Sequence, residues 1–178
     1  MDPLTLALHV CLTLNATVTS FLAKGGLYVN AFANYFHYYA STLEFCVAAN
    51  HTAKLLKEIK TLDALAAEVL QRPPEVQKVL KLTKLVKEMK VLISQLNCTL
   101  KELERASSAL EDLPTVKCVG ETSNPYLEVF CALSDAVERI RTNEPGLVQY
   151  LKSNALEASQ KVSYYESALI GCRMPSSG

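Results

Sequence analysis

The side chains with the clearest chemical potential in this sequence are six cysteines and the asparagines of three N-glycosylation sequons. The cysteines are dispersed and form no CxxC pair, which favours disulfide bonds over a zinc site; they are Cys11, Cys46, Cys98, Cys118, Cys131 and Cys172. The sequons begin at Asn15, Asn50 and Asn97, each followed two residues later by threonine. Because disulfides persist in oxidising compartments, we expect a disulfide-bonded glycoprotein that is secreted or displayed at the cell surface.

Residues suited to catalysis or metal binding form no recognisable pattern. The three histidines, His9, His37 and His51, are scattered and have no second ligand at helical spacing. The sequence also lacks a nucleophile elbow, a glycine-rich phosphate loop and a paired-carboxylate setting. We therefore predict that the protein is not an enzyme and uses neither a cofactor nor a metal ion.

Basic side chains gather in the middle of a chain whose 18 basic and 18 acidic residues balance to a net charge of zero. Five lysines recur every three residues, and a helical hairpin would bring three more to a similar level: Lys78, Lys81, Lys84, Lys87 and Lys90, with Lys54, Lys57 and Lys60. This cluster is either a solvated helix face or a surface that attracts an acidic partner, with Lys84 and Lys87 as candidate contacts. Aromatic residues are not interleaved with it, so we do not expect nucleic-acid binding.

Aromatic residues concentrate in the first fifty positions, which hold only three charged side chains. Adjacent aromatics on a helix point about 100° apart, so they cannot all face one core. Either the first helix covers the second face, or some tyrosines are exposed as anchors for a binding partner. The candidate anchors are Tyr28, Tyr35, Tyr38 and Tyr39.

Sparse proline and glycine residues divide the chain into helices, predicted at about 3–24, 27–71, 75–112 and 125–170. The segment 142–146 predicts either a kink or the start of a new helix within the last of these. An alternating three- and four-residue apolar spacing forms a long seam, interrupted only at Ser107: Val79, Leu82, Val86, Met89, Ile93, Leu96, Leu100, Leu103 and Leu110. No segment shows the alternation of a strand.

These segments predict an all-α fold in a single domain, 1–178. Its architecture would be an elongated, disulfide-braced, antiparallel up-down bundle of three long helices plus a short N-terminal helix. Residues 4–14 are apolar but follow no basic residue, so we assign them to the folded domain rather than to a signal peptide.

The cysteine positions suggest pairings that depend on how the helices turn. Cys46 and Cys98 lie at equal distances from the proline turn near residue 72, which favours their pairing although Cys98 lies off the seam. If the chain reverses at 142–146, Cys172 returns near Cys118 and leaves Cys11 with Cys131. Six cysteines allow 15 connectivities, and the sequence alone does not choose among them.

In its architecture the chain resembles the helical-bundle surface receptors of African trypanosomes. The resemblance rests on the hairpin 27–112, the returning helix 125–170, the dispersed cysteines and the sequons. It implies a membrane-anchored receptor that captures host serum proteins through helix faces. It covers most of the chain but no diagnostic motif, so it assigns no functional residue. No anchor signal follows Cys172, so we expect membrane contact only through an anchor outside these residues.

We therefore predict an extracellular or cell-surface binding protein that recognises a macromolecular partner, such as a host serum protein, through its helix faces. One alternative is a secreted carrier of a hydrophobic small ligand, lined by the first fifty residues. Another is a structural or oligomerising helical bundle.

The tyrosine anchors generate a direct test. If they form an interface, Tyr35→Ala and Tyr38→Ala should weaken partner binding and leave the melting temperature nearly unchanged. A buried aromatic residue truncated to alanine typically lowers the unfolding free energy by about 3–5 kcal/mol, so thermal unfolding separates the two interpretations. Unfolding of both variants would assign these tyrosines to the core.

Overall fold

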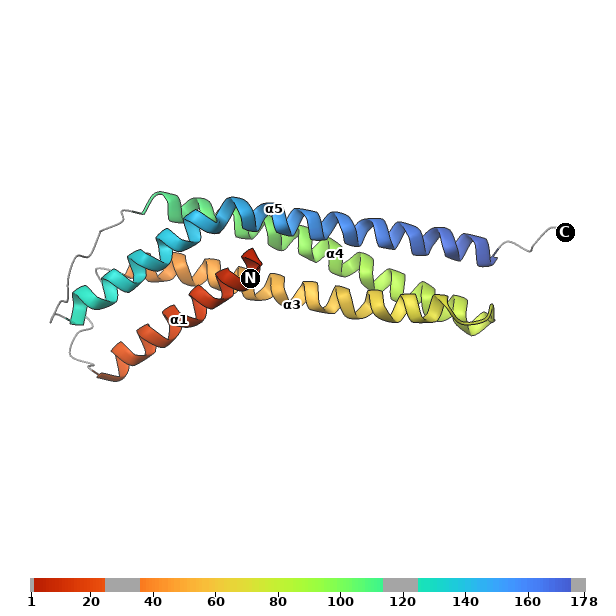
Figure 1. Ribbon diagram of the computed structural model, residues 1–178, viewed down its shortest axis with the longest axis horizontal. Coiled ribbons are helices and arrows are strands. Elements are labelled where there is room, and N and C mark those ends of the chain that lie inside the picture. The colour runs from red at the N-terminus through yellow and green to blue at the C-terminus, as the bar shows by residue number, and fades with distance from the viewer. Residues whose placement is uncertain (1, 25–35, 114–124, 174–178) are drawn as a thin grey trace. The chain divides into compact units, whose positions relative to one another are not determined.

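The computed structural model describes residues 2–24, 36–113 and 125–173, without the side chains of 20–24, 36–39, 125–130, 172 and 173. Four helices account for almost all of the described residues (Figure 1): α1 (Pro3–Lys24), α3 (Phe36–Leu70), α4 (Val76–Glu111) and α5 (Pro125–Arg173). No strand occurs within the described ranges. The predicted all-α class, with three long helices and a shorter N-terminal one, is confirmed.

The helices contribute to two compact units. Unit 1 comprises Met1–Asn50 and Leu100–Tyr150, and unit 2 comprises His51–Thr99 and Leu151–Gly178. Because α3, α4 and α5 each supply residues to both units, the single domain expected from the sequence stays a prediction.

Helix α1 of unit 1 begins at a capped N-terminus. The Thr5 backbone N–H donates to Asp2 Oδ1 at 2.8 Å, and the Thr5 hydroxyl donates to Asp2 Oδ2 at 2.8 Å. These hydrogen bonds, the backbone one foremost, lower the pKa of Asp2 because they favour its ionised form. Pro3 occupies the first helical position, where a missing N–H costs nothing.

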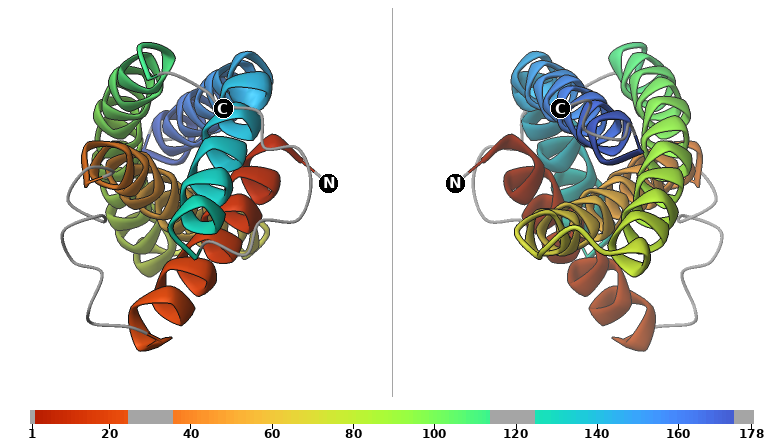
Figure 2. Two further views of the ribbon diagram at one scale, coloured as in Figure 1. Left: turned by 90° about the vertical axis from the view of Figure 1, so that its left-hand side faces the viewer. Right: turned by 90° about the vertical axis from the view of Figure 1, so that its right-hand side faces the viewer.

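The core of unit 1 forms where α1 packs against the N-terminal parts of α3 and α5 and the C-terminal part of α4. One buried stripe follows α1 at three- and four-residue steps: Leu4, Ala7, Cys11, Leu14 and Val18. Figure 2 shows α1 beside the first part of α5, where Asn143 Nδ2 donates to the Pro3 carbonyl at 2.9 Å. The other helices contribute fully buried side chains including Phe45, Leu103, Leu110, Leu133 and Ile140.

No new helix begins at 142–146, since α5 runs continuously through Pro145, so that alternative is wrong and the kink stays a prediction. A proline inside a helix costs about 3 kcal/mol because it removes one backbone hydrogen bond and crowds the preceding turn. Here Ile140 and Leu147 are both buried on either side of Pro145, and Asn143 is tied to α1. Tertiary packing therefore overrides the local helix-breaking signal.

Unit 2 contains a helical hairpin and the C-terminal part of α5. Helices α3 and α4 run antiparallel and are joined by the predicted turn at Arg72-Pro73-Pro74 (Figure 1). Lys78 closes this turn, because its Nζ donates to the Leu70 carbonyl at 2.8 Å and to the Arg72 carbonyl. A cation on these carbonyls satisfies acceptors that the end of α3 leaves free and complements the helix dipole.

The predicted leucine seam forms the core of unit 2. On α4 the residues Leu82, Val86, Met89, Ile93 and Leu96 are buried, and on α3 so are Leu55, Ile59, Ala66 and Val69. Helix α5 contributes Leu151, Ala155, Ala158, Val162, Tyr165 and Leu169. Each fully buried aliphatic side chain contributes roughly 1.5–3 kcal/mol, so this seam is the main source of stability in the unit.

Ser107 is the polar interruption of the seam, and it lies in the core of unit 1. Its hydroxyl is buried without a hydrogen-bond partner among the described residues. We expect Ser107→Ala to raise the unfolding free energy by about 1 kcal/mol more than Ser108→Ala, measured by denaturant titration. Both changes improve helix propensity, but Ser108 is exposed and serves as the matched control. Equal effects would mean that the Ser107 hydroxyl is satisfied.

Candidate functional site

An open groove lies between α3 and α4 in unit 2. It has a volume of about 730 Å³. We call it the α3–α4 groove; its lining is Lys54, Lys57, Glu58, Thr61 and Leu62 from α3, with Lys87, Glu88, Val91 and Leu92 from α4.

The floor of the α3–α4 groove is apolar because the hydrophobic stripes of both helices are wider than the core requires. On α4 the seam residues Met89 and Ile93 are buried, but Val91, on another face, is 56% exposed. Leu62 and Leu92 are half-buried beside it. In a three-helix unit, α5 covers only part of the hairpin, so the edges of both stripes remain in contact with water.

The rim of the α3–α4 groove carries three exposed lysines, Lys54, Lys57 and Lys87. Within the described ranges none of them forms a salt bridge, although Glu58 and Glu88 share the lining. Three cations and two carboxylates leave the lining with one excess positive charge. The groove can therefore accept an apolar surface whose edges carry acidic groups.

The structure divides the lysine cluster that the sequence indicated. Lys87 lines the α3–α4 groove, whereas Lys84 is exposed on α4 outside it. Lys78 caps α3, and Lys90 forms a salt bridge with Glu166 of α5. Two of the eight lysines thus stabilise the fold, and three line the groove.

The predicted tyrosine anchors remain predictions. Tyr28 and Tyr35 lie outside the described residues. Tyr38 and Tyr39 belong to α3, but their side chains lie outside the description.

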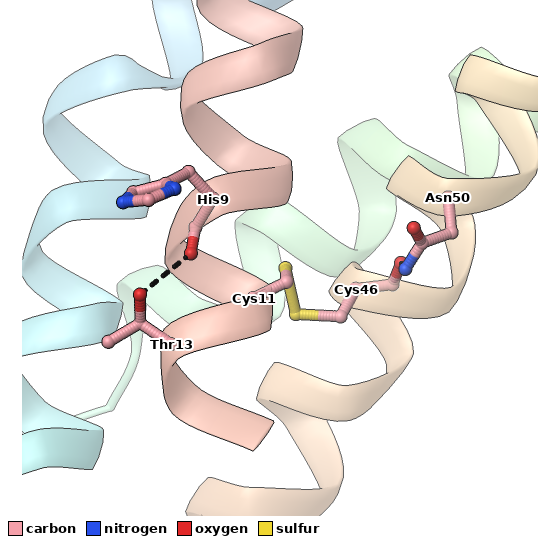
Figure 3. Close-up of a disulfide and its surroundings, with 5 residues drawn as sticks. All are labelled: His9, Cys11, Thr13, Cys46 and Asn50. Atoms are coloured by element: carbon pink, nitrogen blue, oxygen red, sulfur yellow. Dashed lines mark hydrogen bonds between the residues drawn. A yellow bond between two sulfur atoms is a disulfide. The ribbon is translucent and has the colours of Figure 1, made fainter. Parts of the chain in front are cut away.

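The disulfide pairing differs from the prediction. Cys11 of α1 bonds to Cys46 of α3, with the two Cα atoms 5.7 Å apart (Figure 3), so the pairings Cys46–Cys98 and Cys11–Cys131 are wrong. We expected disulfide bonds from the dispersed cysteines, and this expectation is wrong for Cys98, which is free and exposed. Cys131 is disulfide-bonded, while Cys118 and the side chain of Cys172 lie outside the description.

The physical reason for this error is orientation about the helix axis. The earlier pairing compared distances along the hairpin, but Cys98 lies on an exposed face of α4. Cys11 instead belongs to the buried stripe of α1, four residues after Ala7 and three before Leu14. That spacing was visible in the sequence and would have indicated that Cys11 faces a neighbouring helix. On the chain-entropy model, closing the 35-residue separation stabilises the fold by about 3–4 kcal/mol.

All three sequon asparagines are exposed on helices. Asn15 and Asn50 also line a second groove in unit 1, of about 340 Å³, between α1 and α3. Asn97 belongs to α4 within unit 2 and does not line either groove.

The polar cluster around Asp63 in unit 2 has the residue types of a catalytic site but the geometry of a structural tie. The Tyr165 hydroxyl donates to Asp63 Oδ1 at 2.5 Å, and Lys161 Nζ donates to Asp63 Oδ2 at 2.7 Å. Burial, with the neighbouring Asp63 carboxylate, raises the pKa of Tyr165, and the hydrogen bond to Asp63 raises the pKa of Lys161. Both carboxylate oxygens are therefore already engaged, and α3 is fastened to α5.

Histidines and metal-binding groups add no further site. His9 and His51 are exposed, and His37 lies outside the described side chains. Figure 3 shows His9 pointing away from the disulfide. No group of three or more metal-ligating side chains occurs in the described ranges.

Comparison with known proteins identifies no relative. No protein-family model matches the chain, and neither a curated protein nor a solved structure matches it significantly. Among the described helices, none combines the length and apolarity needed to cross a membrane.

The Asp63 tie generates a stability prediction. Tyr165→Phe removes the hydroxyl whose single proton is donated to the Asp63 carboxylate, with the Asp63 carbonyl as a second acceptor at 3.2 Å. We expect the unfolding free energy to fall by about 1.5–3 kcal/mol, the usual range for hydrogen bonds to charged groups. The exposed control Tyr164→Phe should change the unfolding free energy little.

The same hydroxyl predicts a pH dependence. Because the folded-state pKa of Tyr165 is raised, its stabilising contribution is present below the ordinary tyrosine pKa and is lost at more alkaline pH. Denaturant unfolding at neutral and alkaline pH measures both effects; equal losses in the two variants would contradict the tie.

Proposed function

We propose that this protein is an extracellular or cell-surface binding protein that recognises a partner protein through the α3–α4 groove. The observation that supports the proposal is the combination of an exposed apolar floor with a rim of lysines that form no salt bridge among the described residues. Exposed apolar residues bordered by charges are the usual composition of a protein interface, with the floor supplying affinity and the rim supplying orientation.

The shape of the groove favours an amphipathic helix as the bound element. Its α3 side runs from Lys54 to Leu62, which is about 12 Å at 1.5 Å per residue, or roughly two helical turns. A helix can place apolar residues at positions i, i+3 and i+7 over Leu62, Val91 and Leu92. Acidic residues at the edges of that helix would meet the rim lysines.

The extracellular placement is supported by the disulfide between Cys11 and Cys46 and by the bonded state of Cys131. Exposure of Asn15, Asn50 and Asn97 leaves room for glycans at all three sequons. The resemblance in architecture to trypanosome surface receptors would also fit a protein at the cell surface.

A small-ligand carrier is the second candidate, with the α3–α4 groove rather than the first fifty residues as its lining, because a volume of about 730 Å³ lies within the range of ligand pockets. The open form of the groove favours a macromolecular partner, since carriers usually enclose most of the ligand surface. Native mass spectrometry distinguishes the two: a bound lipid mass that disappears in a Val91 variant would favour the carrier. Sizing in solution tests the third alternative, a self-assembling bundle.

The groove hypothesis predicts the effect of one buried charge. Val91→Asp should weaken capture of the partner from serum or host cell surfaces by at least about tenfold, because the carboxylate would be buried against an apolar surface. Lys87→Glu should slow association and make it less sensitive to salt. The matched controls are Val76→Asp and Lys81→Glu, which are exposed on α4 outside the groove.

Circular dichroism should show the same helix content in all four variants, since each altered side chain is exposed. If the groove variants and the controls capture the same proteins equally well, the α3–α4 groove is not the binding site.

A further inference from the structure

The second groove, in unit 1, brings two glycosylation sequons to one apolar surface. It lies beside the Cys11–Cys46 disulfide, and we call it the disulfide groove. Its lining is Leu8, Cys11, Leu12, Leu14 and Asn15 from α1, with Leu43, Cys46, Val47 and Asn50 from α3. Charged residues are absent from this lining, so it differs from the α3–α4 groove in having no ionic rim.

The disulfide groove exposes three large apolar side chains. Leu12 is 67% exposed, Val47 is 61% exposed and Leu43 is 45% exposed. These residues come from two helices that the disulfide holds together, so the exposed side chains form a fixed patch. A contiguous apolar patch promotes aggregation unless something covers it.

We propose that N-linked glycans on Asn15 and Asn50 together cover the disulfide groove. This inference rests on the extracellular placement in the proposed function. The two asparagines approach the groove from opposite helices, and both are exposed. The first sugars of each glycan can lay their apolar ring faces on Leu12, Leu43 and Val47, while their hydroxyls face water.

The side chain of Asn50 has a hydrogen bond in the folded chain that is compatible with an attached glycan. Its Nδ2 donates to the Cys46 carbonyl at 2.9 Å (Figure 3), a contact that needs only one of the two amide protons. In the transfer, Nδ2 gives one proton to a basic group of the transferring enzyme and bonds to C1 of an N-acetylglucosamine carried on a lipid pyrophosphate. The bond from C1 to the pyrophosphate oxygen breaks, and the lipid pyrophosphate leaves with its electron pair. When α3 then folds, the remaining amide proton can make the hydrogen bond to the Cys46 carbonyl and direct the glycan along the groove.

The sequon threonines determine when the transfer takes place. Thr52 is 0% exposed, and the Thr17 hydroxyl donates to the Thr13 carbonyl at 2.9 Å within α1. An enzyme that must contact the threonine of an extended sequon has no access to Thr52 in the folded chain. The glycan on Asn50 is therefore added before α3 packs into unit 1.

The first experiment maps the glycans on the full chain secreted from cultured eukaryotic cells. Enzymatic release in heavy-oxygen water converts each modified asparagine to labelled aspartate, which peptide mass spectrometry locates. We expect label at Asn15 and Asn50. Label only at Asn97 would overturn the covering glycans but would leave the extracellular placement standing. No label at any sequon in the secreted protein would also overturn the covering glycans. Disulfide mapping of the same protein tests the extracellular placement separately.

The second experiment measures coverage of the groove with a fluorescent apolar dye. The variant carrying Asn15→Gln and Asn50→Gln should bind severalfold more dye than the wild type, whereas Asn97→Gln, the matched control, should not. Adding Leu12→Gln and Val47→Gln to the doubly unglycosylated chain should abolish the increase, which assigns the dye to this groove.

Trimming the glycans of the folded wild-type protein provides a test without any substitution. Enzymatic removal of all but the first sugar should raise dye binding less than complete release, because the first sugars make the closest contacts. Unchanged dye binding after complete release would overturn the proposal, even if both asparagines carry glycans.

Discussion

The buried seam of α4 is the constraint on which the rest of the fold depends. Its leucines supply core residues to both units, from Leu82 to Leu96 in unit 2 and from Leu100 to Leu110 in unit 1. A continuous three- and four-residue spacing keeps these side chains on one face, so neighbouring helices must pack against that face. The other faces of α3 and α4 are thereby left to form grooves, and the chemistry of each groove follows from the residues on those faces.

The two grooves keep exposed apolar side chains in water by different means. In unit 2 the floor around Val91 is bordered by lysines and glutamates, which hydrate the edges without closing the groove. In unit 1 the lining around Leu12 and Val47 has no charge and contains two sequon asparagines. The uneven distribution of charge along the sequence therefore has a structural meaning, because the charge-poor first fifty residues rely on packing, a disulfide and the proposed glycans.

The helices were predictable because their ends depend on local signals. Asp2-Pro3 and the proline pair at 73 and 74 mark ends that the structure places within a few residues. The new helix that was one alternative at 142–146 does not form, because the local penalty of Pro145 is outweighed by packing with distant residues, such as the hydrogen bond from Asn143 to the Pro3 carbonyl. The disulfide was missed because distance along a helix carries no information about orientation around it. The α3–α4 groove was only half predictable, since the spacing identified Lys87 but not how far α5 covers Leu62 and Leu92.

Some lysine and arginine side chains in this chain cap helix ends, and others remain exposed to a possible partner. The sequence pattern alone does not distinguish these two roles. Lys78 caps the end of α3, and Arg141 donates to the carbonyls of Leu110 and Leu113 at the end of α4. Both helices lack basic residues in their own last turn, so these cations come from elsewhere in the chain. Both side chains donate hydrogen bonds to backbone carbonyl oxygens, so their charges add little to a surface that could bind a partner. Among the lysines whose side chains the structure describes, Lys54, Lys57 and Lys87 lie beside the apolar floor of the α3–α4 groove, where electrostatic attraction can lead to stable binding.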